Sequence, residues 1–132
     1  MTTVGILFFD DAEELDAIGP WEVFTMVGHF DPHILVASIS QTPAPVRSPQ
    51  RLRIDMDHSF ADAPPLDLLL VPGGQGTRRE VDNQVLLDWI AKVAPGCQWV
   101  TSVCTGSLLL AAAGPARGKR VTTHWGFVDN LR

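Results

Sequence analysis

A β-branched apolar run that passes directly into a helix-forming run constrains this chain more than any other feature. Residues 99–103 read WVTSV, as a buried strand does, and residues 108–113 read LLLAAA, as a helix does. Cys104 stands at the junction between them. At such a junction the side chain projects from the end of a sheet, where backbone N–H groups and the positive helix end stabilise a thiolate. We therefore predict that Cys104 is a reactive nucleophile rather than a cysteine packed under a helix.

The composition is that of one globular domain. The chain has 132 residues, of which 45% are hydrophobic, enough to bury a core. Its formal net charge of −5 gives no electrostatic reason to expect a nucleic acid or an anionic membrane as partner. No apolar run approaches the roughly 20 residues of a membrane helix, and the first residues lack the basic and apolar regions of a signal peptide. Neither cysteine belongs to a CxxC pair, which favours the reducing cytoplasm over a disulfide framework.

Apolar runs of strand length alternate with segments of helical spacing along the rest of the chain. The expected strands cover residues 3–9, 33–38, 66–72, 99–103 and 118–125, and the expected helices cover residues 20–27, 86–93, 108–113 and 127–131. This alternation predicts an α/β fold with a mostly parallel sheet and helices on both faces. Residues 42–57 differ, because prolines interrupt them and apolar residues alternate with charged ones. We expect a half-exposed hairpin there, at an edge or as a flap.

Gly73 and Gly74 close the predicted strand 66–72. An ordinary tight turn would explain two adjacent glycines. Glycine also lets a backbone N–H approach a substrate without a side chain in the way. The N–H groups of Gly74 and Thr105 are therefore the expected pair of oxyanion donors, with Gly73 beside them. No Gly-Lys-Ser/Thr sequence follows, which argues against a phosphate-binding loop.

An acidic group follows the first predicted strand, on the side of the sheet where Cys104 is expected. Asp16 lies there in the loop before the first helix, and its carboxyl group could hold a proton for Cys104 or for a substrate. Glu13 and Glu14 are equally close, and spacing alone does not choose among the three acids. A solvated or helix-capping carboxylate is the simpler interpretation of any one of them.

Of the four histidines, His124 is the one that chain order places near Cys104. It follows the nucleophile by one predicted strand, and it could either approach the thiol or make a structural hydrogen bond. His29 and His33 have the spacing of a zinc pair, but a proline between them breaks the helix that such a pair needs. His58 falls in a predicted loop. We therefore expect no metal site.

Three motifs together resemble the ThiJ/PfpI superfamily. They read VPGG at residues 71–74, SVCTGS at residues 102–107 and GKRVTTHW at residues 118–125. Members of this superfamily have a flavodoxin-like domain related to the class I glutamine amidotransferases. Within it, the Cys-Thr pair and the segment LDAIGP at residues 15–20 are most similar to isonitrile hydratases. The resemblance extends from residue 4 to about residue 125 and implies a flavodoxin-like fold for nearly the whole chain.

The resemblance also implies roles for individual residues. Cys104 matches the nucleophile of the superfamily, and Asp16 matches its acidic partner, which other branches supply as glutamate. Gly74 and Thr105 match the backbone donors. Proteases and amidotransferases of the superfamily place a histidine next to or in line with the cysteine, whereas Thr105 follows Cys104 here. This departure argues against peptidase activity.

An isonitrile hydratase-like lyase is the function that the resemblance implies. Cys104 attacks a small-molecule isonitrile, and hydrolysis of the resulting thioimidate gives an N-substituted formamide without a metal or an organic cofactor. The alternatives are an amidase-like ligand-sensing domain of an AraC-type transcription regulator and a glyoxalase-like stress-protective protein. Members of the superfamily form homodimers, to which residues 52–56 could contribute, and they continue with further strands and helices. We therefore expect residues 1–132 to be a single domain whose C-terminal part is missing.

Overall fold

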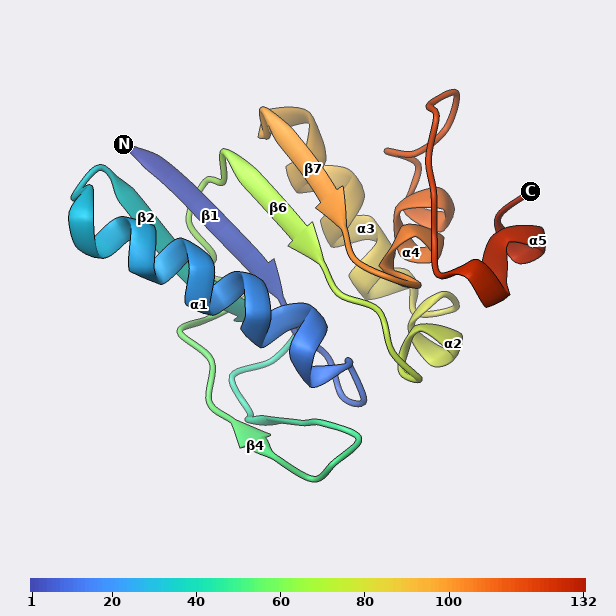
Figure 1. Ribbon diagram of the computed structural model, residues 1–132, viewed down its shortest axis with the longest axis horizontal. Coiled ribbons are helices and arrows are strands. Elements are labelled where there is room, and N and C mark those ends of the chain that lie inside the picture. The colour runs from blue at the N-terminus through green and yellow to red at the C-terminus, as the bar shows by residue number, and fades with distance from the viewer.

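A parallel sheet runs through the middle of the computed structural model, which describes residues 1–132 (Figure 1). Its strands are β1 Thr2–Leu7, β2 Ile34–Ser40, β5 His58–Ser59, β6 Leu68–Val71 and β7 Trp99–Ser102. They lie in the order β5-β2-β1-β6-β7, and every neighbouring pair is parallel. From β1 the chain goes first to β2 on one side and later to β6 on the other. This doubly wound order places the loops after β1, β6 and β7 together at the carboxyl ends of the parallel strands.

Helices cover both faces of the sheet, as the alternating pattern predicts. α1 (Glu14–Phe30) lies on one face, and α3 (Gln84–Val93) and α4 (Gly106–Ala113) lie on the other (Figure 1). Val4, Ile6 and Phe8 pack in the cluster beneath α1, whereas Leu7 and Phe9 belong to the cluster beneath α3 and α4. Burial on both faces explains why residues 3–9 are continuously apolar. No helix is both long enough and apolar enough to cross a bilayer.

Short helical turns complete the structure. They are α2 (Thr77–Glu80), α5 (Val128–Leu131) and the 3₁₀ turns Ala94–Gly96 and Trp125–Phe127. The sequence predicts α5 but gives no indication of α2. α2 follows the glycine-rich loop after β6 and therefore lies at the carboxyl ends of the strands, where the candidate residues meet.

The first helix is longer than its sequence predicts. The spacing predicts a helix that begins at Pro20 and ends before Gly28, but α1 begins at Glu14 and continues to Phe30. Pro20 removes one helical hydrogen bond, that to the Asp16 carbonyl four residues earlier. The inner face of the helix offsets this loss, because Ala17 and Phe24 pack against the strands. Asp16 therefore lies in the first turn of a helix and not in the predicted loop.

Residues 42–57 form the hairpin that their alternating pattern predicts. β3 (Val46–Arg47) pairs antiparallel with β4 (Arg53–Ile54) in a separate two-stranded sheet. The Arg47 N–H donates to the Asp10 carboxylate at 2.9 Å and ties the hairpin to the loop after β1. The next residues correct a second prediction, because His58 lies in the short edge strand β5 rather than in a loop. It pairs there with Ile39 of β2, a long-range contact that local sequence does not reveal.

The opposite edge of the sheet is open along β7. This strand pairs only with β6, and Trp99 is 60% exposed, so β7 is half-exposed and not buried as predicted. The strand predicted over residues 118–125 is wrong as well, since these residues join no sheet. β-branched residues favour a strand only where a neighbouring strand is there to pair with. No strand lies beside residues 118–125, and they pass along the surface next to α4 instead.

Candidate active site

The turn between β7 and α4 holds Cys104 in an uncommon backbone conformation. Its φ of 54° lies in the left-handed region, which residues other than glycine adopt only when the surroundings enforce it. The Val103 N–H donates to the Val71 carbonyl at 3.0 Å, and the Gly106 N–H donates to the Val103 carbonyl at 2.9 Å. A Cβ atom on Gly106 would lie 2.7 Å from the Pro72 carbonyl oxygen, so glycine lets α4 begin close to β6. The predicted strand-to-helix junction is present, with Cys104 half-buried at its apex.

Asp16 is the acid that the structure brings to Cys104. Its Oδ2 accepts a hydrogen bond from the Gly73 N–H at 3.2 Å, and the Cys104 side chain lies close enough to act on the pKa of the carboxyl group. Burial raises the pKa of Asp16, although the hydrogen bond from Gly73, the nearby Cys104 side chain and the charge of His124 act to lower it. A carboxyl group with a raised pKa retains its proton closer to neutral pH, which suits a proton donor.

The two neighbouring acids have other partners. Glu14 accepts a hydrogen bond from the Ser48 hydroxyl of the hairpin. Glu13 takes part through its backbone, whose N–H donates to the Gly73 carbonyl at 2.9 Å. Each residue along a helix turns the side chain by about 100°. The register of α1, which spacing in the sequence does not define, therefore distinguishes Asp16 from the acids beside it.

The Gly73-Gly74 loop after β6 packs directly against the junction. A Cβ atom on Gly73 would lie 2.6 Å from the Thr105 nitrogen and 2.9 Å from Cys104 Cβ, so only glycine permits this approach. Gly74 has a φ of 108° and donates its N–H to Thr105 Oγ1 at 3.1 Å. The Thr105 N–H has no hydrogen-bond partner within the chain. Of the two expected donors, Thr105 is therefore free, and Gly74 is engaged by the Thr105 hydroxyl.

His124 lies at the surface beside this site. The Thr123 hydroxyl donates to the Cys104 carbonyl at 3.1 Å and holds the segment next to the junction. The exposed His124 ring accepts the Gly126 N–H at Nδ1, 3.1 Å away. The structure places His124 within electrostatic reach of Asp16 but gives it no hydrogen bond to Cys104.

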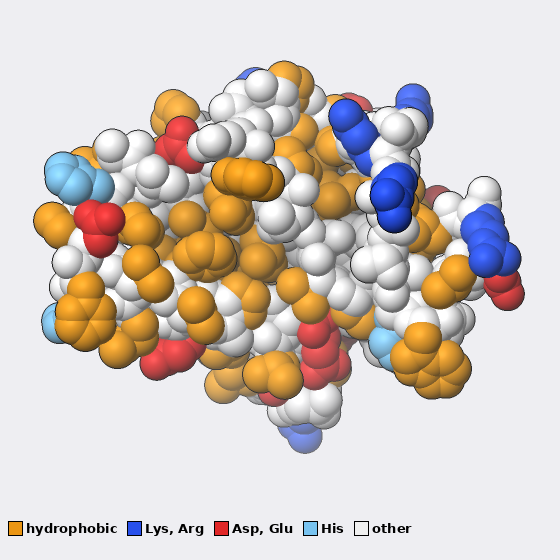
Figure 2. All heavy atoms as spheres, turned by 45° about the horizontal axis from the view of Figure 1, so that its top comes forward, with side chains coloured by type: hydrophobic (Ala, Val, Ile, Leu, Met, Phe, Trp, Pro, Cys, Tyr) orange, Lys and Arg blue, Asp and Glu red, His pale blue; other side chains and the backbone are white.

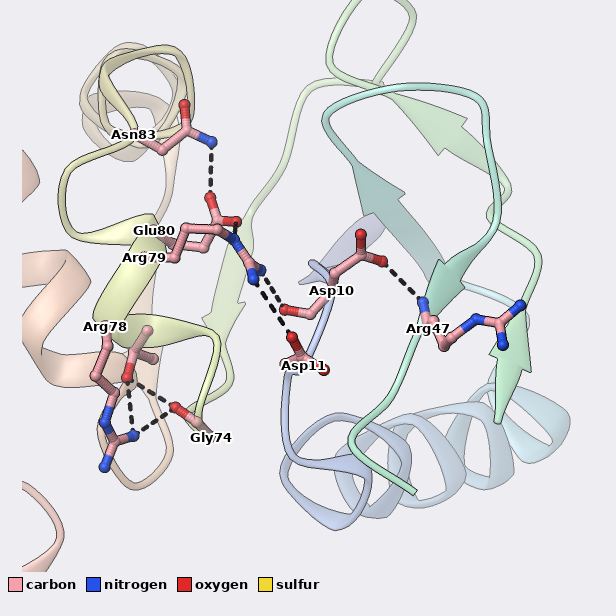
Figure 3. Close-up of polar contacts among 9 residues, drawn as sticks. Asp10, Asp11, Arg47, Gly74, Arg78, Arg79, Glu80 and Asn83 are labelled. Atoms are coloured by element: carbon pink, nitrogen blue, oxygen red, sulfur yellow. Dashed lines mark hydrogen bonds and ion pairs between the residues drawn. The ribbon is translucent and has the colours of Figure 1, made fainter. Parts of the chain in front are cut away.

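Sequence reasoning missed the side chains of α2, which join the loops after β1 and β6 (Figure 3). Arg79 donates from Nη2 to the Asp10 carbonyl at 2.6 Å. Arg78 donates from Nη1 to the Gly74 carbonyl at 2.7 Å, and its guanidinium carbon lies 4.3 Å from the centre of the Phe127 ring. Two adjacent arginines after a glycine-rich loop were the available signal. The partner of Arg79, Asp10, lies 69 residues away in the sequence, so the pattern alone does not reveal the role of these side chains.

The most voluminous surface pocket lies away from Cys104. Its volume is about 870 Å³, it follows the open edge of β7, and its lining includes Cys97, Trp99 and Pro115. Burial and the nearby charge of Asp67 raise the pKa of the Cys97 thiol, which makes it a poor nucleophile at neutral pH. No group of three or more His, Cys, Asp or Glu side chains is arranged to hold a metal ion. Cys104 and Asp16 are therefore the candidate reactive groups of the chain.

The sequence and the fold both assign this chain to a known family. Residues 2–132 match the DJ-1/PfpI family, so the chain belongs to it. The isonitrile hydratase of Pseudomonas putida is 39% identical over 128 residues, which are 97% of this chain and 54% of that protein. A deglycase of Pyrococcus abyssi is 27% identical over 126 residues, which are 96% of this chain and 74% of that protein.

A solved structure confirms the fold. The crystal structure of a ThiJ/PfpI family protein from Pseudomonas syringae matches with a TM-score of 0.89 and 30% identity, covering 98% of this chain and 53% of that chain. The present chain thus spans about half the length of this protein and of the isonitrile hydratase. The predicted fold class and the predicted family are both confirmed.

Proposed function

We propose that this protein is a cysteine-dependent lyase that hydrates isonitriles to N-substituted formamides. The Cys104 thiolate adds to the terminal isonitrile carbon, and Asp16 gives its proton to the same carbon. The product of this step is a thioimidate bound through a new S–C bond. Water then adds to that carbon and the S–C bond breaks, which releases the formamide and restores the thiolate and the Asp16 proton. The sum is the addition of one water to the isonitrile, so no cofactor is required.

The proximity of the Asp16 carboxyl group to the Cys104 side chain, which acts on the pKa of Asp16, is the observation that supports this proposal most. The first step needs a nucleophile and a proton donor at one carbon atom, and both groups meet here. The raised pKa of Asp16 favours the protonated form that the step uses. The Thr105 N–H, which has no partner in the chain, is available to stabilise charge that develops on the substrate. Similarity to an isonitrile hydratase supports the substrate class.

Formamide production from a simple aryl isonitrile tests the proposal. Cys104→Ser is the variant expected to abolish formamide production, and Cys97→Ser is the matched control. We expect the control to keep the wild-type rate, because Cys97 lies along the pocket beside β7 and not at the junction. Wild-type protein that forms no formamide at any soluble isonitrile concentration would overturn the proposal.

A second substrate in the same assay separates the alternative functions. The similarity to a deglycase favours a glyoxalase-like protein as second candidate. Consumption of methylglyoxal without formamide production would select that candidate. Saturable isonitrile binding without turnover of either compound would favour a ligand-sensing domain.

We further propose that a second copy of the chain covers the outer face of α1. Leu15, Val23, Met26 and Phe30 lie along one side of this helix and are 76%, 61%, 49% and 80% exposed. Figure 2 shows hydrophobic side chains gathered over the half of the molecule where α1 lies. Exposed apolar surface of this extent is typical of a protein interface. An antiparallel pair of α1 helices would place the acidic first turn of one helix beside His29 of the other.

The oligomeric state in solution tests this surface. We expect wild-type protein to have the mass of a dimer in light scattering, and Leu15→Glu to have the mass of a monomer. Val85→Glu is the control, since Val85 is 57% exposed on α3, on the opposite face of the sheet. A monomeric wild-type protein, or dissociation by both substitutions, would contradict the proposed interface.

A further inference from the structure

The backbone of Gly74 is held at both of its polar groups by side chains that the proposed reaction does not use. Its N–H donates to Thr105 Oγ1 at 3.1 Å. Its carbonyl oxygen lies 2.8 Å from Thr77 Oγ1 and 2.7 Å from Arg78 Nη1, and Figure 3 shows Arg78 facing this carbonyl. The Thr77 and Thr105 hydroxyl oxygens lie 3.1 Å apart. Thr77 is fully buried and Thr105 is 2% exposed, so both hydroxyl groups are shielded from water.

These contacts form a closed ring when each hydroxyl proton is assigned once. A threonine hydroxyl carries one proton and can rotate to donate in either direction. Thr77 gives its proton to the Gly74 carbonyl. Thr105 gives its own proton to Thr77 Oγ1 and accepts the Gly74 N–H. Every buried polar atom of the ring then has a partner, which is the condition under which a buried network stabilises a structure.

The ring acts on the site through Gly73. The peptide plane between Gly73 and Gly74 is held at one end by Thr105 and at the other by the Glu13 N–H, which donates to the Gly73 carbonyl at 2.9 Å. A fixed plane leaves only the dihedrals of Gly73 itself to orient its own N–H. That N–H donates to the Asp16 carboxylate. Holding Gly74 therefore also holds the donor that orients Asp16.

We propose that Thr77 is a positioning residue for the Cys104 site, which keeps the Gly73-Gly74 loop in place for the reaction, with Arg78 as a second support. The inference rests on the proposed function, because its kinetic effect is expected in isonitrile hydration. Thr77 lies in the buried ring and aligns groups that act in the transition state. Its loss therefore lowers kcat more than it changes KM.

Three substitutions separate the hydroxyl from the side chain as a whole. Thr77→Val removes the hydroxyl and keeps the branched shape, and Thr77→Ser keeps the hydroxyl. Thr101→Val is the control, because the Thr101 hydroxyl donates to the Leu69 carbonyl at 3.0 Å within the sheet. We expect T77V to lower kcat about tenfold with KM within about twofold, T77S to recover to within about threefold of wild type, and T101V to match wild type. Equal kcat values for T77V and T101V would overturn the inference.

Amide hydrogen exchange distinguishes failure of this inference from failure of the proposed function. In protein without substrate, T77V is expected to speed the exchange of the Gly73 and Gly74 amides about tenfold, and T101V is expected to leave them unchanged. If wild-type protein forms no formamide, the proposed function fails, and the exchange rates alone decide whether Thr77 holds the loop. Unchanged exchange in T77V overturns the inference. If T77V does not fold, the exposed Arg78→Met substitution decides by the same measurements, with a smaller effect in the same direction.

Discussion

Gly73 provides a direct test of how closely the loop after β6 packs against Cys104. A Cβ atom there would lie 2.6 Å from the Thr105 nitrogen, 2.8 Å from Thr105 Oγ1 and 2.9 Å from Cys104 Cβ. These neighbours are backbone atoms or the first atoms of side chains, so they cannot rotate far away. To bring the shortest distance from 2.6 Å to the 3.4 Å of ordinary contact, the loop must retreat by about 0.8 Å.

The magnitude of the effect follows from this displacement. A retreat of the loop lengthens the 3.2 Å hydrogen bond from the Gly73 N–H to Asp16 and loosens the orientation of the carboxyl group. A misplacement of about 1 Å in a catalytic group costs up to about 100-fold in rate, so we expect Gly73→Ala to lower kcat/KM by about 10- to 100-fold. The added methyl group also overpacks the site, which costs about 1–3 kcal/mol of stability.

The assay compares formamide production by two alanine variants. Gly96→Ala is the matched control, because nothing lies within 4 Å of the Cβ that it adds. Thermal melting establishes that both variants are folded at the assay temperature. A folded G73A protein with kcat/KM within about twofold of G96A would show that the loop is not in tight contact with the junction.

Three further predictions concern charge and capping. His124→Ala should move the titration midpoint of the Asp16 carboxyl, measured by ¹³C NMR, to higher pH, because the charge of His124 lowers this pKa; an unchanged midpoint would show that the ring is too distant. Burial raises the pKa of Asp16 in the folded state, so ionising it costs stability as pH rises above the ordinary aspartate value. The melting temperature of Asp16→Asn relative to wild type should therefore increase with pH in a calorimetric series, and a flat difference would contradict this. Asn83→Ala should lower the free energy of unfolding in urea by about 1 kcal/mol, because the Asn83 side chain caps α3 and donates to the buried Glu80; an unchanged value would contradict both roles.

The parts of the fold that depend on short-range patterns were predictable. The strands at residues 3–9 and 66–72 are continuously apolar because the sheet is covered on both faces, and the structure confirms them. The junction at Cys104 was also predictable, because the strand and the helix that form it adjoin in the sequence. The hairpin within residues 42–57 belongs to the same class of local pattern.

The parts that depend on long-range pairing were not predictable. Residues 118–125 have the composition of a strand, but a strand exists only where another one lies beside it. His58 was expected in a loop, and instead it lies in the edge strand β5 and pairs with β2.

The choice of Asp16 among three adjacent acids could not be made from spacing alone. It depends on the register of α1 and on the Gly73 N–H, which comes from a loop 57 residues away in the sequence. The role of α2 was hidden for the same reason, because Arg79 reaches a carbonyl 69 residues away. Sequence patterns therefore located the candidate site, and tertiary contacts decided which side chains meet in it.

We propose that the Asp16 carboxyl group and the Cys104 thiol act as one unit, and the rate of formamide production by Asp16→Asn tests this coupling. We expect a rate about 100-fold or more below wild type, as for the loss of a general acid, while Cys104 still reacts with iodoacetamide. A rate within about threefold of wild type would show instead that the thiol acts without the acid beside it.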